Sequence, residues 1–178
     1  EIDLKMVTTN EYDTVYKAKL SAKMLQLAGR EDVVVGIGEV GHESFNRIHD
    51  WVDDYDLSAY PNVRENAADA MIEYIMSSDE EVVILAIGSF KNLAEAYAKE
   101  PRIAKKSRVV AIAGNVYNNG FVGWYPALAS EWNIRCDLDA WRRGVEKTDW
   151  EVELLPLDVS GGIILDTPYF DKVREYGK

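Results

Sequence analysis

Short apolar runs alternate with amphipathic segments along most of this chain. Three of the runs contain no polar residue, which is typical of strands buried on both faces of a sheet. They cover Val33–Ile37, Val82–Ile87 and Val109–Ala113. A strand at 2–8 is predicted from alternating apolar and polar residues, and a further strand is predicted at 152–159.

Helices are predicted between these strands, where apolar residues recur at helical spacing. The first helix begins at Asp13 or Thr14, either of which can cap it, and ends at Ala28 before Gly29. The remaining helices are predicted at 64–76, 92–99, 138–147 and 170–176. Because strands alternate with helices, the sequence predicts an α/β fold with a mostly parallel sheet covered on both faces.

Small or polar residues follow several of the predicted strands. They are Gly38, Gly88-Ser89, Gly114-Asn115 and Asp158. In open α/β sheets, ligands bind beyond the carboxyl ends of the strands, so the loops at this edge are the candidates for a site.

Glu131 and Asn133 follow the longest of these loops. A carboxylate and a carboxamide two positions apart point the same way on an extended backbone, where they match the vicinal hydroxyls of a sugar. The spacing alone fits a second interpretation, in which both are loop residues that cap a helix beginning near Asp137.

Composition narrows the class of protein. The 178 residues suit one domain, and a net charge of −11 without a basic patch argues against a nucleic-acid partner. No apolar run is long enough to span a membrane. The lone Cys136 excludes an internal disulfide and favours a reducing, cytoplasmic compartment. A homo-oligomer is left open.

Three further patterns suggest chemistry but have simpler explanations. The dinucleotide fingerprint G-x-G-x-x-G occurs at 36–41, yet it lies in the second strand unit and no second strand carries the required acid. In a helix, His42 and His49 would lie two turns apart, which is too far for the two side chains alone to bind one metal ion. An acidic cluster at 53–56 lacks the glycine and the distal glutamate of an EF-hand loop.

Four motifs, in collinear order, resemble the nucleoside hydrolases of the inosine-uridine preferring type. Residues 84–94 resemble that family's strand followed by Gly-Pro-Leu-Thr-Asn-Leu-Ala, and 129–137 resemble its Ala-Glu-Phe-Asn-x-x-x-Asp block. Residues 155–159 are similar to the strand that follows, and 51–61 to a loop of one branch. The resemblance covers nearly the whole chain.

The resemblance implies a doubly wound α/β domain that hydrolyses the N-glycosidic bond of ribonucleosides and carries Ca²⁺. Glu131 and Asn133 match the family's ribose-binding pair, and Asp13 lies near its sugar-contacting Asn. The Ile87 backbone carbonyl matches an oxygen that the family supplies to the metal. Three aromatic residues are candidates for stacking on the base, with core packing as the alternative: Trp124, Tyr125 and Trp132.

The chain also departs from the family pattern. The family's Asp-x-Asp-x-x-x-Asp-Asp signature is expected before residue 1 and its last metal aspartate beyond residue 178, so 1–178 is expected to be the central portion of one larger domain. Without those carboxylates this chain alone is not expected to bind Ca²⁺ tightly or to hold catalytic residues. Two hypotheses follow: part of a complete nucleoside hydrolase, or a catalytically inactive relative with a ligand-binding or assembly role.

Overall fold

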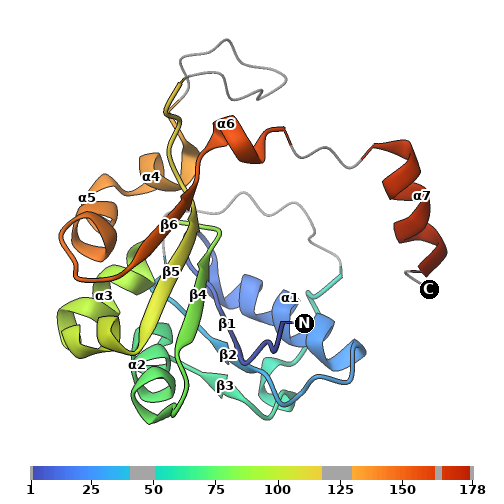
Figure 1. Cartoon of the computed structure of the whole chain (residues 1–178). Helices are drawn as coiled ribbons and strands as arrows, with labels where there is room; N and C mark the ends of the chain where they lie inside the picture. The colour runs from blue at the N-terminus through green and yellow to red at the C-terminus, as the bar shows by residue number, and fades with distance from the viewer. Residues whose placement is uncertain (1, 41–50, 118–129, 163–165, 177–178) are drawn as a thin grey trace.

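Six strands and seven α-helices are present in the computed structural model, which describes residues 2–40, 51–117, 130–162 and 166–176 (Figure 1). The strands are β1 (Met6–Thr8), β2 (Val34–Gly36), β3 (Val63–Arg64), β4 (Val82–Ala86), β5 (Ser107–Ile112) and β6 (Val152–Leu155). The α-helices are α1 (Thr14–Leu27), α2 (Ala67–Ser77), α3 (Lys91–Lys99), α4 (Trp132–Cys136), α5 (Leu138–Trp141), α6 (Leu157–Ser160) and α7 (Thr167–Tyr176). Shorter helical turns are η1 (Leu57–Ala59), η2 (Pro101–Lys105) and the π-helical η3 (Arg142–Glu146).

All pairing between described strands is parallel, as predicted, but the strands form two sheets rather than one. The first sheet has the order β1-β2-β3 and the second β4-β5-β6. β1 and β4 are edge strands of the two sheets (Figure 1), and no ladder joins them in the described part of the chain. The α/β class is confirmed, and the predicted single sheet is corrected to two parallel halves.

Each sheet has its own apolar cluster. In the first, α1 packs through Ala18, Ala22 and Leu25 against β2, while α2 approaches the other face so closely that a Cβ on Gly36 would lie 3.1 Å from Ala67 Cα. Helices therefore lie on both faces of this sheet.

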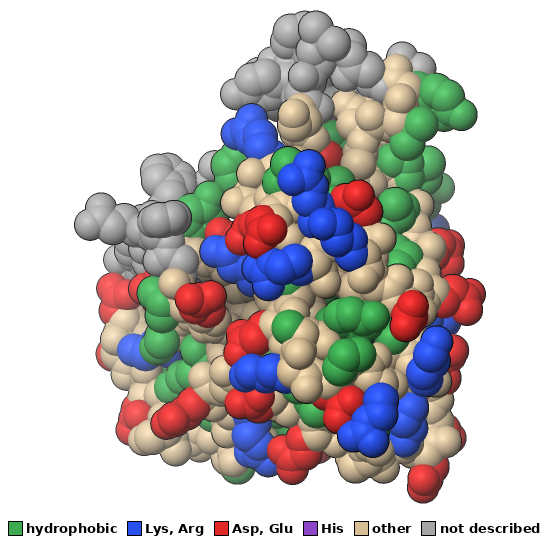
Figure 2. All heavy atoms as spheres, turned by 90° about the vertical axis from the view of Figure 1, so that its left-hand side faces the viewer, with side chains coloured by type: hydrophobic (Ala, Val, Ile, Leu, Met, Phe, Trp, Pro, Cys, Tyr) green, Lys and Arg blue, Asp and Glu red, His purple; other side chains and the backbone are tan. Residues whose placement is uncertain are grey.

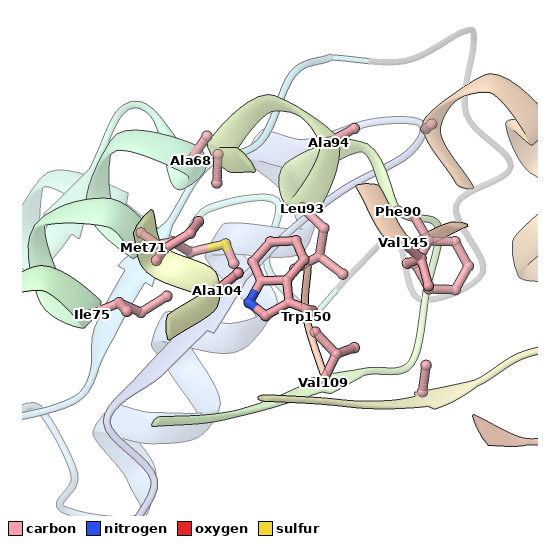
Figure 3. Close-up of a cluster of buried hydrophobic side chains, with 14 of the residues drawn as sticks. Ala68, Met71, Ile75, Phe90, Leu93, Ala94, Ala104, Val109, Val145 and Trp150 are labelled. Atoms are coloured by element: carbon pink, nitrogen blue, oxygen red, sulfur yellow. The ribbon is translucent and has the colours of Figure 1, made fainter. Parts of the chain in front are cut away.

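The second sheet is covered by α2, α3 and η3. Its cluster includes Phe90 from the start of α3, Val109 from β5, Val145 from η3 and Trp150 (Figure 3). The Trp150 indole is 6% exposed and donates a hydrogen bond to Ser107 Oγ at 2.9 Å. This packing fixes α3, and with it the polar residues at the carboxyl end of β4.

Several predicted boundaries are wrong for local reasons. The strand predicted at 152–159 ends at Leu155, because Pro156 cannot donate to a ladder and introduces α6. The helix predicted at 138–147 is α5 continued by the π-helical η3. The strand at 2–8 shortens to β1. The pattern did not predict β3, α4, η1 or η2, all of which are five residues or shorter.

No helix in the described ranges is long and apolar enough to cross a membrane. The longest, α1, has 14 residues, whereas a bilayer core needs about 20.

Candidate functional site at the carboxyl edge

The turns that follow β1 and β4 are joined by side chains, although the two strands do not pair. Asn10 Nδ2 donates to the Ser89 carbonyl at 2.5 Å, and Asn92 Nδ2 donates to the Thr9 carbonyl at 3.0 Å. Ser89 Oγ donates to Glu11 Oε1 at 2.7 Å, and Lys91 Nζ lies 3.2 Å from the same oxygen. We call these residues, Asn10, Glu11, Ser89, Lys91 and Asn92, the β1–β4 clasp.

The clasp stands on a strained turn. Glu11 and Tyr12 both have φ of 56°, a left-handed conformation that costs a residue with a Cβ about 1–2 kcal/mol. Lys17 Nζ stabilises the turn by donating to the Asn10 carbonyl at 2.8 Å and the Glu11 carbonyl at 3.0 Å. Burial lowers the pKa of the Lys17 amine, although nearby Glu11 acts in the opposite sense.

Two glycines make the close approach of these turns feasible. A Cβ on Gly88 would lie 2.8 Å from Asn10 Oδ1. One on Gly38 would clash with the Thr9 carbonyl and lie 2.6 Å from Asn92 Oδ1. The second glycine of the dinucleotide fingerprint thus has a packing explanation, and no helix begins at residues 39–40 to complete that motif. Residues 41–50, with His42 and His49, lie outside the described part.

Glu131 and Asn133 hold the start of α4 at the end of β5. The Glu131 carboxylate, in a residue 5% exposed, accepts from the Asn133 amide at 2.7 Å and the Ile134 amide at 2.9 Å. Asn133 Nδ2 donates to the Ile112 carbonyl at 2.9 Å. Glu131 therefore caps α4, whereas the predicted capping concerned a helix near Asp137. Asn133 is helical, so the extended backbone supposed for the pair is not present.

The other predicted site residues lie at the same edge of the strands. Asp13 caps α1, with Oδ1 accepting from the Tyr16 amide at 2.8 Å. Ile87 directly follows β4 and is 75% exposed. Trp132 is half-exposed and stacks with Arg135, whose guanidinium carbon lies 4.9 Å from the ring centroid. Trp124 and Tyr125 lie outside the described residues.

The charges of Glu11 and Glu131 both affect the pKa of the Cys136 thiol. Burial is the largest cause that raises the pKa of this thiol, followed by the negative charges of Glu11 and Glu131. Arg135 and Lys91 act in the opposite sense. The turn after β1 is bonded to Ser89 after β4, and the start of α4 is bonded to Ile112 of the paired strand β5, so the two lie at one edge of the strands.

The described residues do not fit a Ca²⁺ site by themselves. They contain no group of three or more His, Cys, Asp or Glu side chains that could hold a metal ion. The Ile87 carbonyl is one oxygen, whereas Ca²⁺ takes six to eight. The acidic cluster at 53–56 forms a turn instead, in which Asp56 caps η1 and hydrogen bonds from Ser58 lower the pKa of its carboxyl.

A cleft of about 620 Å³ opens beside the clasp, at the carboxyl ends of β2 and β3 and along α3. Its wall carries charges of both signs: Glu39, Glu65, Glu95, Asp137, Lys91, Lys99 and Arg143. Figure 2, which faces the side of α3 and α5, shows acidic and basic side chains interleaved there. Only Lys91 belongs both to the cleft and to the clasp.

Sequence reasoning missed Glu11, Lys17 and Lys91. Their types gave no signal, because each lies in a turn or at a helix start where charged residues are common. Asp158 was noted only as a strand end, yet its carboxylate accepts from the Val116 and Tyr117 amides at 2.7 and 3.0 Å and so fixes the turn after β5.

Comparison with known proteins decides the family. The family model for the inosine-uridine preferring nucleoside hydrolases matches residues 1–178. The chain belongs to this nucleoside hydrolase family. A curated family member from Crithidia fasciculata, the inosine-uridine preferring nucleoside hydrolase, is 27% identical over 124 residues, which cover 66% of this chain and 38% of that protein.

Solved nucleoside hydrolases share the fold. The inosine-uridine preferring enzyme from Bacillus anthracis superposes with a TM-score of 0.72 at 22% identity, covering 96% of this chain and 62% of that one. A plant nucleoside hydrolase gives a TM-score of 0.61 at 24% identity over 86% of this chain and 51% of that one. The chain therefore spans between about two fifths and three fifths of the length of these nucleoside hydrolases.

Proposed function

We propose that this chain forms the sugar-binding rim of a domain that hydrolyses ribonucleosides to ribose and free base. Membership of the nucleoside hydrolase family is the observation that carries the proposal. The location of Asp13, Ile87 and Glu131 beyond the strand ends supports it, because ligands of open α/β sheets bind at that edge. The proposed compartment is the reducing cytoplasm, in keeping with one free thiol.

Each proposed residue has a chemical role in this reaction. Glu131 and Asn133 would bind the ribose hydroxyls through oxygen acceptors and amide donors, with Asp13 contacting the same ring. The transition state of glycosidic cleavage is oxocarbenium-like, so a buried carboxylate near the ring stabilises the charge that develops. In the complete domain a bound Ca²⁺ would orient the sugar and activate water, with the Ile87 carbonyl among its ligands. The described residues do not form its site by themselves.

One observation favours the alternative, an inactive relative with a ligand-binding or assembly role. Both oxygens of the Glu131 carboxylate already accept backbone hydrogen bonds, so contact with a ribose would require sharing them. A carboxylate has about four lone-pair sites, and the capping bonds leave capacity for a sugar hydroxyl.

Binding of inosine to this chain, measured by titration calorimetry, tests the role of Glu131. Glu131→Gln keeps one amide-capping oxygen but removes the charge, and it is expected to weaken binding about tenfold, the effect of one charge-assisted hydrogen bond. Asp56→Asn, which alters the cap of η1, is the control and is expected to leave affinity unchanged. Equal affinity of Glu131→Gln and the unaltered chain would remove Glu131 from the site.

Activity of the full-length gene product separates the two hypotheses. Ribose release from inosine and uridine is expected if the domain is a nucleoside hydrolase. Binding without ribose release, in protein saturated with Ca²⁺, would establish the inactive relative instead.

A further inference from the structure

We propose that Glu11 is a ligand-binding residue of this protein, whose carboxylate accepts a hydrogen bond from a hydroxyl of the bound pentose. The inference rests on the proposed function and deepens it by adding a residue at a position that the sequence analysis did not single out.

The backbone places Glu11 at an energetic cost. Two consecutive residues in the left-handed region, Glu11 and Tyr12, are uncommon outside glycine. Such strain persists only where the surroundings impose it, and it clusters at sites of binding and catalysis. Here the Lys17 amine imposes it through the carbonyls of Asn10 and Glu11.

The side chain is held on one oxygen only. Glu11 Oε1 receives both Ser89 Oγ at 2.7 Å and Lys91 Nζ at 3.2 Å. Among the described residues no side chain or backbone amide donates to Oε2, while 14% of the side chain is exposed. A carboxylate anchored in this way presents its second oxygen as a preorganised acceptor, which binds a hydroxyl without first losing rotamer freedom.

The position of Glu11 suits a ligand that also reaches Glu131. Glu11 belongs to the turn after β1, in the first sheet, and Glu131 is tied to β5 of the second sheet through Asn133. Glu11 is bonded to Ser89, which follows β4, and Asn133 is bonded to Ile112 of β5, the strand paired with β4, so both carboxylates lie at the same edge of the strands. A five-membered ring with adjacent hydroxyls has donors on neighbouring carbons and can address acceptors from two sides.

Lys91, the ion-pair partner of Glu11, also contributes to the proposed site. Its ammonium offsets the negative charge of Glu11 in a protein of net charge −11, so the pair adds no uncompensated charge to the rim. An ammonium also has three donors, of which the pair with Glu11 uses one, leaving others for a sugar oxygen.

The test is inosine and ribose binding to variants of this chain, with the unfolding midpoint in urea recorded for each. Glu11→Gln is expected to weaken binding of both probes about tenfold or more, since hydrogen bonds to charged groups contribute most. Glu100→Gln is the matched control: Glu100 is also ion-paired, with Arg102 at 2.5 Å and a side chain 20% exposed, but it caps η2 at the opposite edge. The control is expected to bind like the unaltered chain.

A structure of the unaltered chain with inosine covers the case in which Glu11→Gln does not fold. Glu11 Oε2 is then expected about 2.6–3.2 Å from a ribose hydroxyl. Unchanged affinity in a folded Glu11→Gln, or a ribose elsewhere in the complex, would overturn this inference and leave the proposed function standing. If the unaltered chain and the full-length protein bind neither probe, the proposed function fails and this inference falls with it.

Discussion

Two adjacent residues, Glu11 and Tyr12, are the non-glycine residues with positive φ in the described backbone. Both adopt φ of 56°, and both side chains meet a lysine: Glu11 pairs with Lys91, and the Tyr12 ring lies 5.3 Å from Lys17 Nζ. A glycine at residue 12 would relieve the backbone but lose the ring. Because a tyrosine adopts this conformation, contacts from outside the turn, such as those of Lys17, must impose it.

Comparison of Tyr12→Gly with Tyr12→Ala isolates this strain, because both changes remove the ring. Glycine is expected to be more stable than alanine by about 1 kcal/mol, since only glycine adopts positive φ without steric cost. Urea unfolding measures the difference. At Lys19, in the middle of α1, the same pair should show the reverse order, with alanine more stable by about 1 kcal/mol. Alanine ahead of glycine at both positions would mean that the turn is not strained.

At this scale the sequence could predict which residues lie near the rim but not their bonds. Residue type and spacing drew attention to Glu131 and Asn133, the family resemblance made them site candidates, and both lie at the end of β5. The capping role of Glu131 could not be predicted, because it depends on where α4 begins. A helix of five residues leaves no periodic signal in the sequence. Glu11 could not be found, because its partners Ser89 and Lys91 are 78 and 80 residues away along the chain.

Among the elements, α3 determines where the clasp residues of the second sheet lie. It packs against η3 so tightly that a Cβ on Gly144 would lie 2.7 Å from the Ala94 amide nitrogen and 3.0 Å from the Phe90 carbonyl oxygen. Both neighbours are backbone atoms, which cannot rotate away. Phe90 also packs edge-on against Trp141, with ring centroids 4.9 Å apart.

Gly144→Ala is therefore expected to destabilise the protein by about 1–3 kcal/mol, the cost of overpacking a close contact. A loss of stability would be informative, because a Gly→Ala substitution in a helical segment normally stabilises the protein. Gly162→Ala is the control, since its Cβ would meet nothing closer than the Val159 carbonyl oxygen at 3.4 Å. The midpoint of thermal or urea unfolding gives the comparison, and equal midpoints for the two variants would show that α3 and η3 can separate freely.

Most elements could be predicted from periodicity. Errors arose where a single residue ends an element or where the element is very short. The three unbroken apolar runs became β2, β4 and β5, and the stripe of α1 packs on the first sheet as expected. Pro156 divides a run that reads as one strand into β6 and α6. β3 pairs through two residues, too few for any pattern.

At the scale of the molecule, the division into two sheets leaves β1 and β4 each with one unpaired side in the described structure. The Val82 amide of β4 donates at 2.9 Å to the carbonyl of Lys106, the residue that precedes β5. Since parallel ladders alternate, the amides of Ile84 and Ala86 also point toward β5, and those of Val83 and Leu85 point away. The sequence could not reveal this division, because a run of apolar residues has the same appearance in a paired and an unpaired strand.

Amide hydrogen exchange followed by NMR should resolve the two sides of β4. Ile84 and Ala86 are expected to exchange at least tenfold more slowly than Val83 and Leu85, because only the former pair with β5. The amides of Val109 and Ala113 in the region of β5, which donate to Glu151 and Leu155 carbonyls, are internal references for paired positions. Similar protection throughout β4 would show that its outer side is covered in solution.

The two apolar clusters both contact α2 but share no strand ladder in the described structure, and each half of the molecule is a candidate for melting as its own cooperative unit. What joins the halves at the carboxyl rim is a handful of side chains rather than a continuous ladder. A small molecule that binds one half through residue 11 and the other half through residue 131 would link the two halves and stabilise them together. Calorimetry would then record the event as a merging of two heat-absorption peaks into one.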